Sequence, residues 1–172
     1  GSFKEVDGET ALALIRCLSR ASGAAGMIGG QVIDLEGENR EDLTLDELVA
    51  MHRKKTGAMI EAAAVLGCIV SGYSDEESVE VRKIREFSSN LGLAFQIKDD
   101  ILDVVGDEKS LGKPIGSDEE QGKNTFVTML GIEAAEARLQ ELTERAVGAL
   151  DSFGEKAWFL RELSDMLISR DS

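Results

Sequence analysis

The sequence predicts an all-α protein, and three features of its composition support that prediction. Of its 172 residues, 42% are hydrophobic and 30% are charged, as in globular proteins. There is one proline, aromatic residues make up 5%, and residues that favour helices, such as Ala, Leu and Glu, dominate the long segments. The polar–apolar alternation of half-buried strands is scarce. A chain of this length suits one domain, so we expect a single all-α region over residues 1–172.

The first helical region is expected at about residues 8–35. Its second half carries a glycine at nearly every helical turn, which weakens a helix but lets another helix approach closely. These glycines do not form G-x-G-x-x-G and no strand precedes them, so a dinucleotide site is not supported. A polar loop over 36–42 should follow. The glycines are Gly23, Gly26, Gly29 and Gly30.

A second long helix is expected over about 44–71. Thr44 and Glu47 have the spacing of a capping box, in which the two side chains satisfy backbone N–H groups at a helix start. Gly72 follows the last apolar residues of the pattern and should end the helix.

Ser74 and Glu77 repeat the capping spacing, which predicts a third helix over about 74–105 that Gly106 ends. The remaining expected elements are a polar loop over 107–124 and helices over 125–130, 132–152 and 155–169, with Gly154 at the last break.

Composition also restricts the partners and the compartment. The formal net charge of −14 argues against non-specific binding to nucleic acid or to anionic membranes. Cys17 and Cys68 lie far apart and form no C-x-x-C, which is typical of a reducing cytoplasm. No signal peptide is apparent, and the longest apolar run, 62–70, is interrupted by Gly67. We therefore expect a cytoplasmic protein without membrane insertion.

The single histidine, His52, is followed directly by Arg53, Lys54 and Lys55. A lone histidine in a basic stretch is typical of a protein surface. We expect His52 on the surface rather than in a catalytic role.

The most informative segment is 95–103, which places carboxylates inside an apolar helical pattern. On a helix Asp99 and Asp103 are i and i+4 and share one face, with Gln96 one turn earlier. Two stacked carboxylates repel each other less when a cation lies between them, and carboxylate oxygens are ligands that Mg²⁺ prefers. A solvated acidic helix face is the alternative, but the flanking residues of 91–105 are too apolar for a simple exposed stripe.

Three other segments place polar groups where a helical core would be apolar. Gln31 and Asp34 share a helix face, and Lys55 with Thr56 precedes an apolar run. Each has an ordinary alternative explanation: a lined helix end for the first pair and a snorkelling lysine for the second. The third segment is a loop, and an ordinary surface connection is its alternative explanation. The loop lacks the glycine spacing and the preceding strand of a P-loop, which argues against nucleotide hydrolysis. Together the segments supply carboxylates for Mg²⁺ and lysines for phosphate oxygens. The loop residues concerned are Lys113, Asp118 and Lys123.

Four motifs follow one another along the chain. They are Gly30-Gln31-x-x-Asp34-Leu35, Lys55-Thr56-Gly57, Phe95-Gln96-x-x-Asp99-Asp100-Ile101-Leu102-Asp103, and Gly112-Lys113-Pro114-x-Gly116-Ser117-Asp118-x-x-x-Gly122-Lys123. In this order they resemble the motifs of the trans-isoprenyl diphosphate synthases, most closely the bacterial farnesyl diphosphate synthase (geranyltranstransferase) type. The resemblance covers about residues 21–123, continues weakly through the last helices, and implies an all-α bundle around a deep central cavity.

The resemblance also implies an activity and a role for each motif residue. The activity is Mg²⁺-dependent head-to-tail condensation of isopentenyl diphosphate with an allylic diphosphate, giving farnesyl diphosphate. Thr56 and Gln96 would flank the allylic carbon, and Lys55 would act with them and bind diphosphate. The other diphosphate-binding residues would be Lys113, Lys123 and Gln31. Asp99 and Asp103 would bind the metal directly. Asp34 would line the metal side of the cavity, and Asp118 would hold a metal-bound water. Asp100 ranks lower as a metal ligand because it points elsewhere on the helix.

The chain departs from this family in lacking a first aspartate-rich motif and an N-terminal basic cluster. We therefore expect the C-terminal part of a longer synthase, inactive alone, with an exposed apolar groove where missing helices would pack, and a homodimer when intact. A longer-chain synthase, such as a geranylgeranyl type, is an alternative within the enzymes. A noncatalytic partner subunit is an alternative from another class, and the retained site residues argue against it.

Overall fold

Every regular element in the described part of the chain is helical. The computed structural model describes residues 6–38, 40, 42–73, 75, 77–105 and 123–170, and no strand is found among them. The all-α prediction is confirmed.

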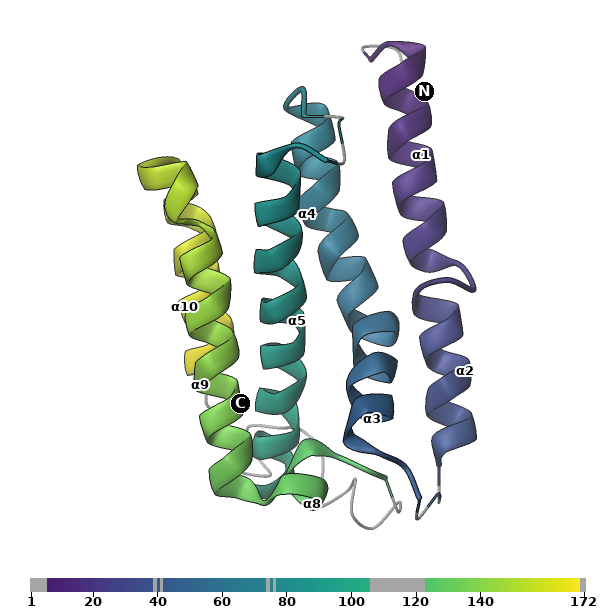
Figure 1. Ribbon diagram of the computed structural model, residues 1–172, viewed down its shortest axis with the longest axis vertical. Coiled ribbons are helices and arrows are strands. Elements are labelled where there is room, and N and C mark those ends of the chain that lie inside the picture. Colours follow the sequence, from purple (N-terminus) through teal and green to yellow (C-terminus); the bar gives the residue numbers. More distant parts are fainter. Residues whose placement is uncertain are drawn as a thin grey trace.

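The expected first helix is two helices, α1 (Gly8–Ser22) and α2 (Met27–Gly37), which stack end to end (Figure 1). Asp7 begins α1 by accepting the backbone N–H groups of Glu9 and Thr10. The chain then turns between the helices, where a Cβ on Gly26 would lie 2.0 Å from the carbonyl oxygen of Ala21. The helical region predicted over 8–35 is confirmed, but it is divided here, because glycine permits a tight turn that other residues could not make.

The second predicted helix is continuous but changes its winding. It consists of α3 (Leu45–His52), a π-helical turn η1 (Arg53–Gly57) and α4 (Ala58–Val70). The predicted capping box is confirmed, since the Thr44 and Glu47 side chains each accept from the other's backbone N–H. Gly72 ends the helix as predicted, with φ of 93°; its N–H donates to Ile69 O while Tyr73 N–H donates to Cys68 O.

The third long helix, α5 (Val79–Val105), begins later than predicted. Ser78 accepts the backbone N–H of Val81 and so serves the helix start, whereas Ser74 lies outside the described residues. Gly106, predicted to end the helix, also lies outside them. The remaining elements are α8 (Phe126–Leu130), α9 (Ile132–Ala149), the 3₁₀ segment η2 (Asp151–Ala157), which contains Gly154 at φ 56° as the predicted break, and α10 (Trp158–Ser169).

The long helices run side by side, with α5 between α4 and α9 (Figure 1). Two buried clusters form along α5. One lies at the α8 end and includes Leu48, Ile97 and Phe126; the other includes Phe87 and Leu150. The first cluster supports the polar residues described below, because Ile97 lies in α5 between Gln96 and Asp99.

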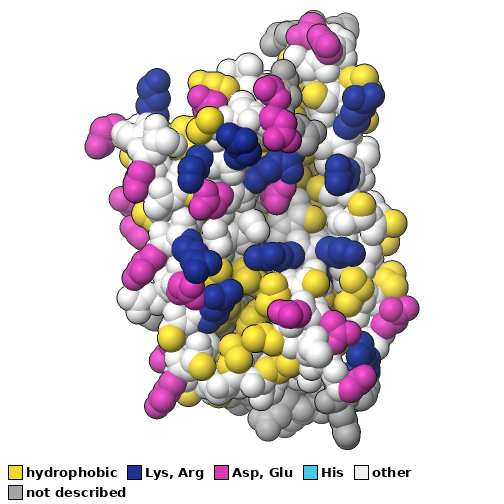
Figure 2. Space-filling model, in the orientation of Figure 1, with side chains coloured by type: hydrophobic (Ala, Val, Ile, Leu, Met, Phe, Trp, Pro, Cys, Tyr) yellow, Lys and Arg dark blue, Asp and Glu magenta, His cyan; other side chains and the backbone are white. Residues whose placement is uncertain are grey.

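The helices α1 and α2 leave many apolar side chains exposed, and α1 has no buried residue. Figure 2 shows further hydrophobic side chains gathered at the lower centre of the face it presents, with Lys and Arg side chains above them. By length and hydropathy alone, Gly8–Gly37 is the one candidate membrane span among the described residues, a test that core helices of water-soluble proteins also pass. The expected exposure of apolar surface is therefore present. The exposed residues of α1 and α2 are Leu12, Ile15, Leu18, Met27, Ile28, Val32 and Leu35.

Candidate functional site

A pocket of about 450 Å³ lies where α2, α3, the π turn and α5 meet the segment that leads into α8. Side chains of both charges line it, so it suits an anionic ligand carried with a cation. Its charged and amide-bearing residues are Asp34, Glu38, Lys55, Gln96, Asp99, Asp100, Lys123, Asn124 and Arg170, and His52 also lines it.

Lys55 and Asp34 meet at one side of this pocket, with the Lys55 Nζ 2.6 Å from Asp34 Oδ2. Gly30 makes the approach of their helices possible, because a Cβ there would lie 2.2 Å from the Lys55 backbone nitrogen. The predicted close helix approach at a glycine is confirmed at this position. Lys55 is thus held at the pocket by a carboxylate that an incoming anion can displace.

The π turn Arg53–Gly57 carries both Lys55 and Thr56. Single π turns inside α-helices are rare and occur frequently at functional sites, because the extra residue changes the direction of the side chains. A matching close approach occurs at Gly92 of α5, where a Cβ would lie 3.4 Å from the Gly57 Cα. The turn and α5 therefore pack closely beside the pocket.

A chain of hydrogen bonds links the π turn to α5. Gln96 Oε1 lies 3.2 Å from the Thr56 hydroxyl, which donates to it, and 2.9 Å from His52 Nδ1. At its other end Gln96 Nε2 donates to Asp99 Oδ2 at 3.2 Å. The structure thus brings together Thr56, Gln96 and Asp99, which the sequence placed in two separate motifs.

His52 does not lie on the surface as predicted; it is partly buried and lines the pocket. Its ring stacks on Phe126 with centroids 5.5 Å apart, and its Nε2 is buried without a hydrogen-bond partner. Burial lowers the pKa of this imidazole below 6.5, although its hydrogen bond with Gln96 and the charge of Asp34 act in the opposite direction. The basic neighbours in the sequence suggested exposure, but Arg53 and Lys54 are exposed while His52 faces inward.

The three aspartates of the 95–103 segment differ in their surroundings. Asp99 lines the pocket with its side chain 41% exposed. Asp100 is buried, and its Oδ2 accepts the backbone N–H of Phe126 at 2.7 Å, so its carboxylate holds the start of α8. Asp103 is 3% exposed and is not among the pocket-lining residues. Asp100 nevertheless lines the pocket although it was ranked below Asp103, so the predicted ranking of the three as metal residues stays a prediction.

Arg170 contacts the same carboxylate from the end of the described chain. Its guanidinium pairs with Asp99 and lies over the Phe95 ring, 4.2 Å from the centroid. No sequence pattern indicated this residue, because 71 positions separate it from Asp99 and no motif contains it. A cation from the chain itself therefore occupies a carboxylate expected to bind metal.

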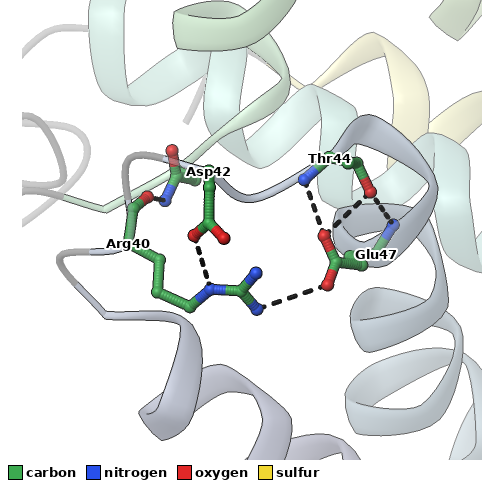
Figure 3. A network of polar contacts seen from close by, with 5 residues as sticks. Arg40, Asp42, Thr44 and Glu47 are labelled. Atoms are coloured by element: carbon green, nitrogen blue, oxygen red, sulfur yellow. Dashed lines mark hydrogen bonds and ion pairs between the residues drawn. The ribbon is translucent and has the colours of Figure 1, made fainter.

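A second polar network joins the segment after α2 to the start of α3 (Figure 3). Arg40 donates to Asp42 at 2.9 Å and to Glu47 at 3.3 Å, which ties the loop after α2 to the capping box of α3. The Asn124 side chain donates to the Arg40 carbonyl oxygen at 2.9 Å. Because Asn124 follows Lys123, this bond fixes the backbone beside a lysine that lines the pocket.

The remaining predicted site residues fall into two groups. Gln31 is exposed and is not among the lining residues, whereas Asp34, one helical turn later on α2, does line the pocket. Lys113 and Asp118 lie outside the described residues, so their predicted roles stay predictions.

The described residues contain no group of three or more His, Cys, Asp or Glu side chains arranged to enclose a metal ion by themselves. The donor chemistry nevertheless fits a hydrated Mg²⁺, which usually takes one or two protein carboxylates and completes its coordination with water and substrate phosphate. Asp99 offers a half-exposed carboxylate of this kind next to the lysines.

This all-α architecture encloses a pocket that lysines and carboxylates line together. The chain belongs to the polyprenyl synthetase family: the family model described as Polyprenyl synthetase matches residues 3–157. Among curated relatives, the farnesyl diphosphate synthase of Escherichia coli is 39% identical over 170 residues, covering 97% of this chain and 56% of that protein. The dimethylallyltranstransferase of Fischerella ambigua is 42% identical over 167 residues, covering 97% and 47%.

Solved structures agree with the sequence relatives. The geranyltransferase of Helicobacter pylori, complexed with magnesium and isoprenyl diphosphate, superposes with a TM-score of 0.79 at 34% identity and covers 97% of this chain and 54% of its own. The geranylgeranyl pyrophosphate synthetase of Pyrococcus horikoshii superposes with a TM-score of 0.81 at 28% identity. The match covers 96% of this chain and 61% of that structure. The chain thus spans about half the length of the relatives it matches.

Proposed function

We propose that the protein containing this chain is a trans-prenyltransferase that condenses isopentenyl diphosphate with an allylic diphosphate, dimethylallyl or geranyl, to give farnesyl diphosphate. The observation that carries this proposal is the convergence of Lys55, Gln96, Asp99 and Lys123 on one pocket of a polyprenyl synthetase fold. Several of the most similar curated relatives are farnesyl diphosphate synthases, which supports this product.

Lys55 and Lys123 would bind the diphosphate of the allylic substrate. Their ammonium groups neutralise phosphate oxygens, and this stabilisation grows as the C–O bond to the diphosphate breaks and negative charge collects on the leaving group. The Asp34 carboxylate holds Lys55 at the pocket until the anion arrives. Asp34 thus orients the lysine rather than contacting the reacting atoms.

Thr56 and Gln96 would stabilise the positive charge that develops on the allylic carbon. Breaking the allylic bond leaves a carbocation, and oxygens of hydroxyl and amide groups fixed beside it favour that charge. The isopentenyl double bond then attacks the cation, and loss of a proton restores a double bond in the product. Water has to be excluded from the pocket, since it would quench the cation.

Mg²⁺ is the cofactor we propose, held by Asp99 with the diphosphate. Asp34 and Asp118 are further candidates, and Asp103, which is buried outside the pocket lining, would need to turn toward the pocket to serve as the second carboxylate. Bound there, Mg²⁺ would supply Lewis-acid stabilisation of the leaving diphosphate. The Helicobacter pylori relative, solved with magnesium and isoprenyl diphosphate, supports this assignment. We further propose a cytoplasmic homodimer for the intact protein.

A geranylgeranyl or longer-chain product is the second candidate. It is favoured by matches to the geranylgeranyl diphosphate synthase of Cyanophora paradoxa, 33% identical over 169 residues, and to the Pyrococcus horikoshii structure. Both candidates share the same pocket chemistry and differ only in when chain growth stops.

Incubating the complete protein with isopentenyl and geranyl diphosphates, with and without Mg²⁺, tests the proposal. We expect Mg²⁺-dependent formation of a farnesyl product, identified by mass spectrometry, and loss of product in Lys55→Met but not in the neighbouring Lys54→Met. A larger product would select the second candidate. No condensation with any allylic diphosphate would contradict the prenyltransferase assignment.

A further inference from the structure

The proposed chemistry of the pocket leaves one lining residue unexplained, the partly buried His52. It sits at the end of α3, directly before the π turn, with its ring stacked on Phe126 and its Nδ1 2.9 Å from the Gln96 side-chain oxygen. Its other nitrogen, Nε2, is buried without a hydrogen-bond partner. His52 therefore has one hydrogen bond in the described structure, and that bond goes to a proposed catalytic side chain.

The direction of each hydrogen bond follows from Asp99. An ionised carboxylate can only accept, so the Gln96 group 3.2 Å from Asp99 Oδ2 has to be the amide nitrogen. The amide oxygen then faces His52 and Thr56, and because that oxygen only accepts, both partners donate to it. His52 accordingly carries its proton on Nδ1, and Nε2 keeps a lone pair.

We propose that His52 is a positioning residue for Gln96: as a neutral imidazole protonated on Nδ1, it fixes the amide with its oxygen toward Thr56 and its nitrogen toward Asp99. This inference rests on the proposed function only for its catalytic consequence. A freely rotating amide would present nitrogen as often as oxygen to an allylic cation, whereas a fixed amide dipole is preorganised for it. A neutral ring also adds no positive charge beside that cation.

The support for His52 comes from the same helix that carries Gln96. Asp100 accepts the backbone N–H of Phe126, the Phe126 ring stacks on His52, and His52 bonds to Gln96, which bonds in turn to Asp99. This series of contacts therefore begins at Asp100 of α5 and ends at Gln96 of the same helix. Asp100 thus contributes to the site through α8.

Nitrogen NMR tests the tautomer directly. In protein labelled with ¹⁵N at histidine, the signals lost in His52→Asn identify the imidazole of His52. We expect a protonated Nδ1 and an unprotonated Nε2 at neutral pH. A proton on Nε2 would overturn the proposal whatever reaction the protein catalyses.

Paired variants test the positioning role. Asn at position 52 can place an amide N–H near the position of Nδ1, whereas Leu removes the donor and keeps apolar packing. In the complete enzyme we expect His52→Leu to lower kcat on the order of tenfold to hundredfold with KM little changed, and His52→Asn to keep most of the rate. Equal loss in both variants, or no loss in His52→Leu, would overturn the role.

A readout without catalysis separates this inference from the proposed function. The side-chain amide protons of Gln96 should exchange slowly with solvent in the parent and in His52→Asn, and rapidly in His52→Leu. Circular dichroism and urea midpoints of both variants confirm that they fold. If exchange is unchanged in folded His52→Leu, His52 does not position Gln96, even if prenyl transfer is demonstrated.

Discussion

The carboxylate of Asp100 accepts the backbone N–H of Phe126 at 2.7 Å, so one helix both presents Asp99 to the pocket and anchors the start of α8. Phe126 is the first residue of α8, and the first N–H groups of a helix have no partner inside it. Adjacent aspartates in α5 therefore have different roles. Asp99 presents a half-exposed carboxylate to the pocket, whereas the buried Asp100, which also lines the pocket, holds a neighbouring helix.

Removing the Asp100 carboxylate should destabilise the fold. Asp100→Ala leaves a buried N–H without an acceptor, and we expect the free energy of unfolding to fall by about 2 kcal/mol in urea titrations. Asp100→Asn keeps an acceptor oxygen and should cost less. Asp99→Ala is the matched control, because that side chain is half-exposed and its ion pair should contribute at most about 1 kcal/mol. Equal losses at both positions would contradict the structural role of Asp100.

Two glycines should respond in opposite ways to the same substitution. Gly30→Ala places a methyl group 2.2 Å from the Lys55 backbone nitrogen, which cannot rotate away, so we expect a loss of about 3 kcal/mol or more. Gly67→Ala meets nothing within 4 Å on an exposed face of α4 and should raise stability by up to about 1 kcal/mol. Thermal unfolding of the two variants measures both effects, and a tolerated Gly30→Ala would refute the close approach of α2 to the π turn.

Anion binding should depend on Lys55 and not on its neighbour. Calorimetric titration with inorganic pyrophosphate in Mg²⁺ should show roughly tenfold or weaker affinity in Lys55→Met, since a charge-assisted contact is lost. Lys54→Met changes the same net charge at an exposed position and should bind as the parent does. Folding stability should barely change in Lys55→Met, because its pair with Asp34 is partly solvated. Comparable weakening in both variants would point to a diffuse charge effect.

Burial of His52 predicts the sign of one pH dependence. Its pKa is lowered in the folded protein, so between the ordinary value of 6.5 and the folded value the unfolded chain binds more protons. This contribution to stability is fully present above pH 6.5 and is lost as the pH falls through the folded pKa. Urea titrations from pH 7.5 to 5 should show a smaller decline in His52→Asn than in the parent. An imidazole that titrates by NMR at or above 6.5 would contradict this.

Local signals in the sequence predicted much of the fold. The capping box of Thr44 and Glu47 and the break at Gly154 were predicted because their causes lie within a few residues. Groups that meet only after folding were not predictable in this way. His52 reaches Gln96 across 44 residues and Arg170 reaches Asp99 across 71, and neither distance leaves a pattern in the sequence. The turn at Gly26 was missed because a glycine in an apolar helical pattern fits a helix and a break equally well.

The π turn at Arg53–Gly57 also changes the angular phase of the side chains between α3 and α4. An α-helix advances about 100° per residue, so the additional residue in this turn rotates everything after it by roughly that angle. The apolar periodicity of α3 therefore cannot be extended into α4, and each half has its own phase. Deleting one residue within the turn would restore a regular helix and bring the two halves into one phase. That shorter chain would turn α4 away from its packing against α5, so a gap at this place in an alignment signals a rearranged pocket rather than a neutral loss.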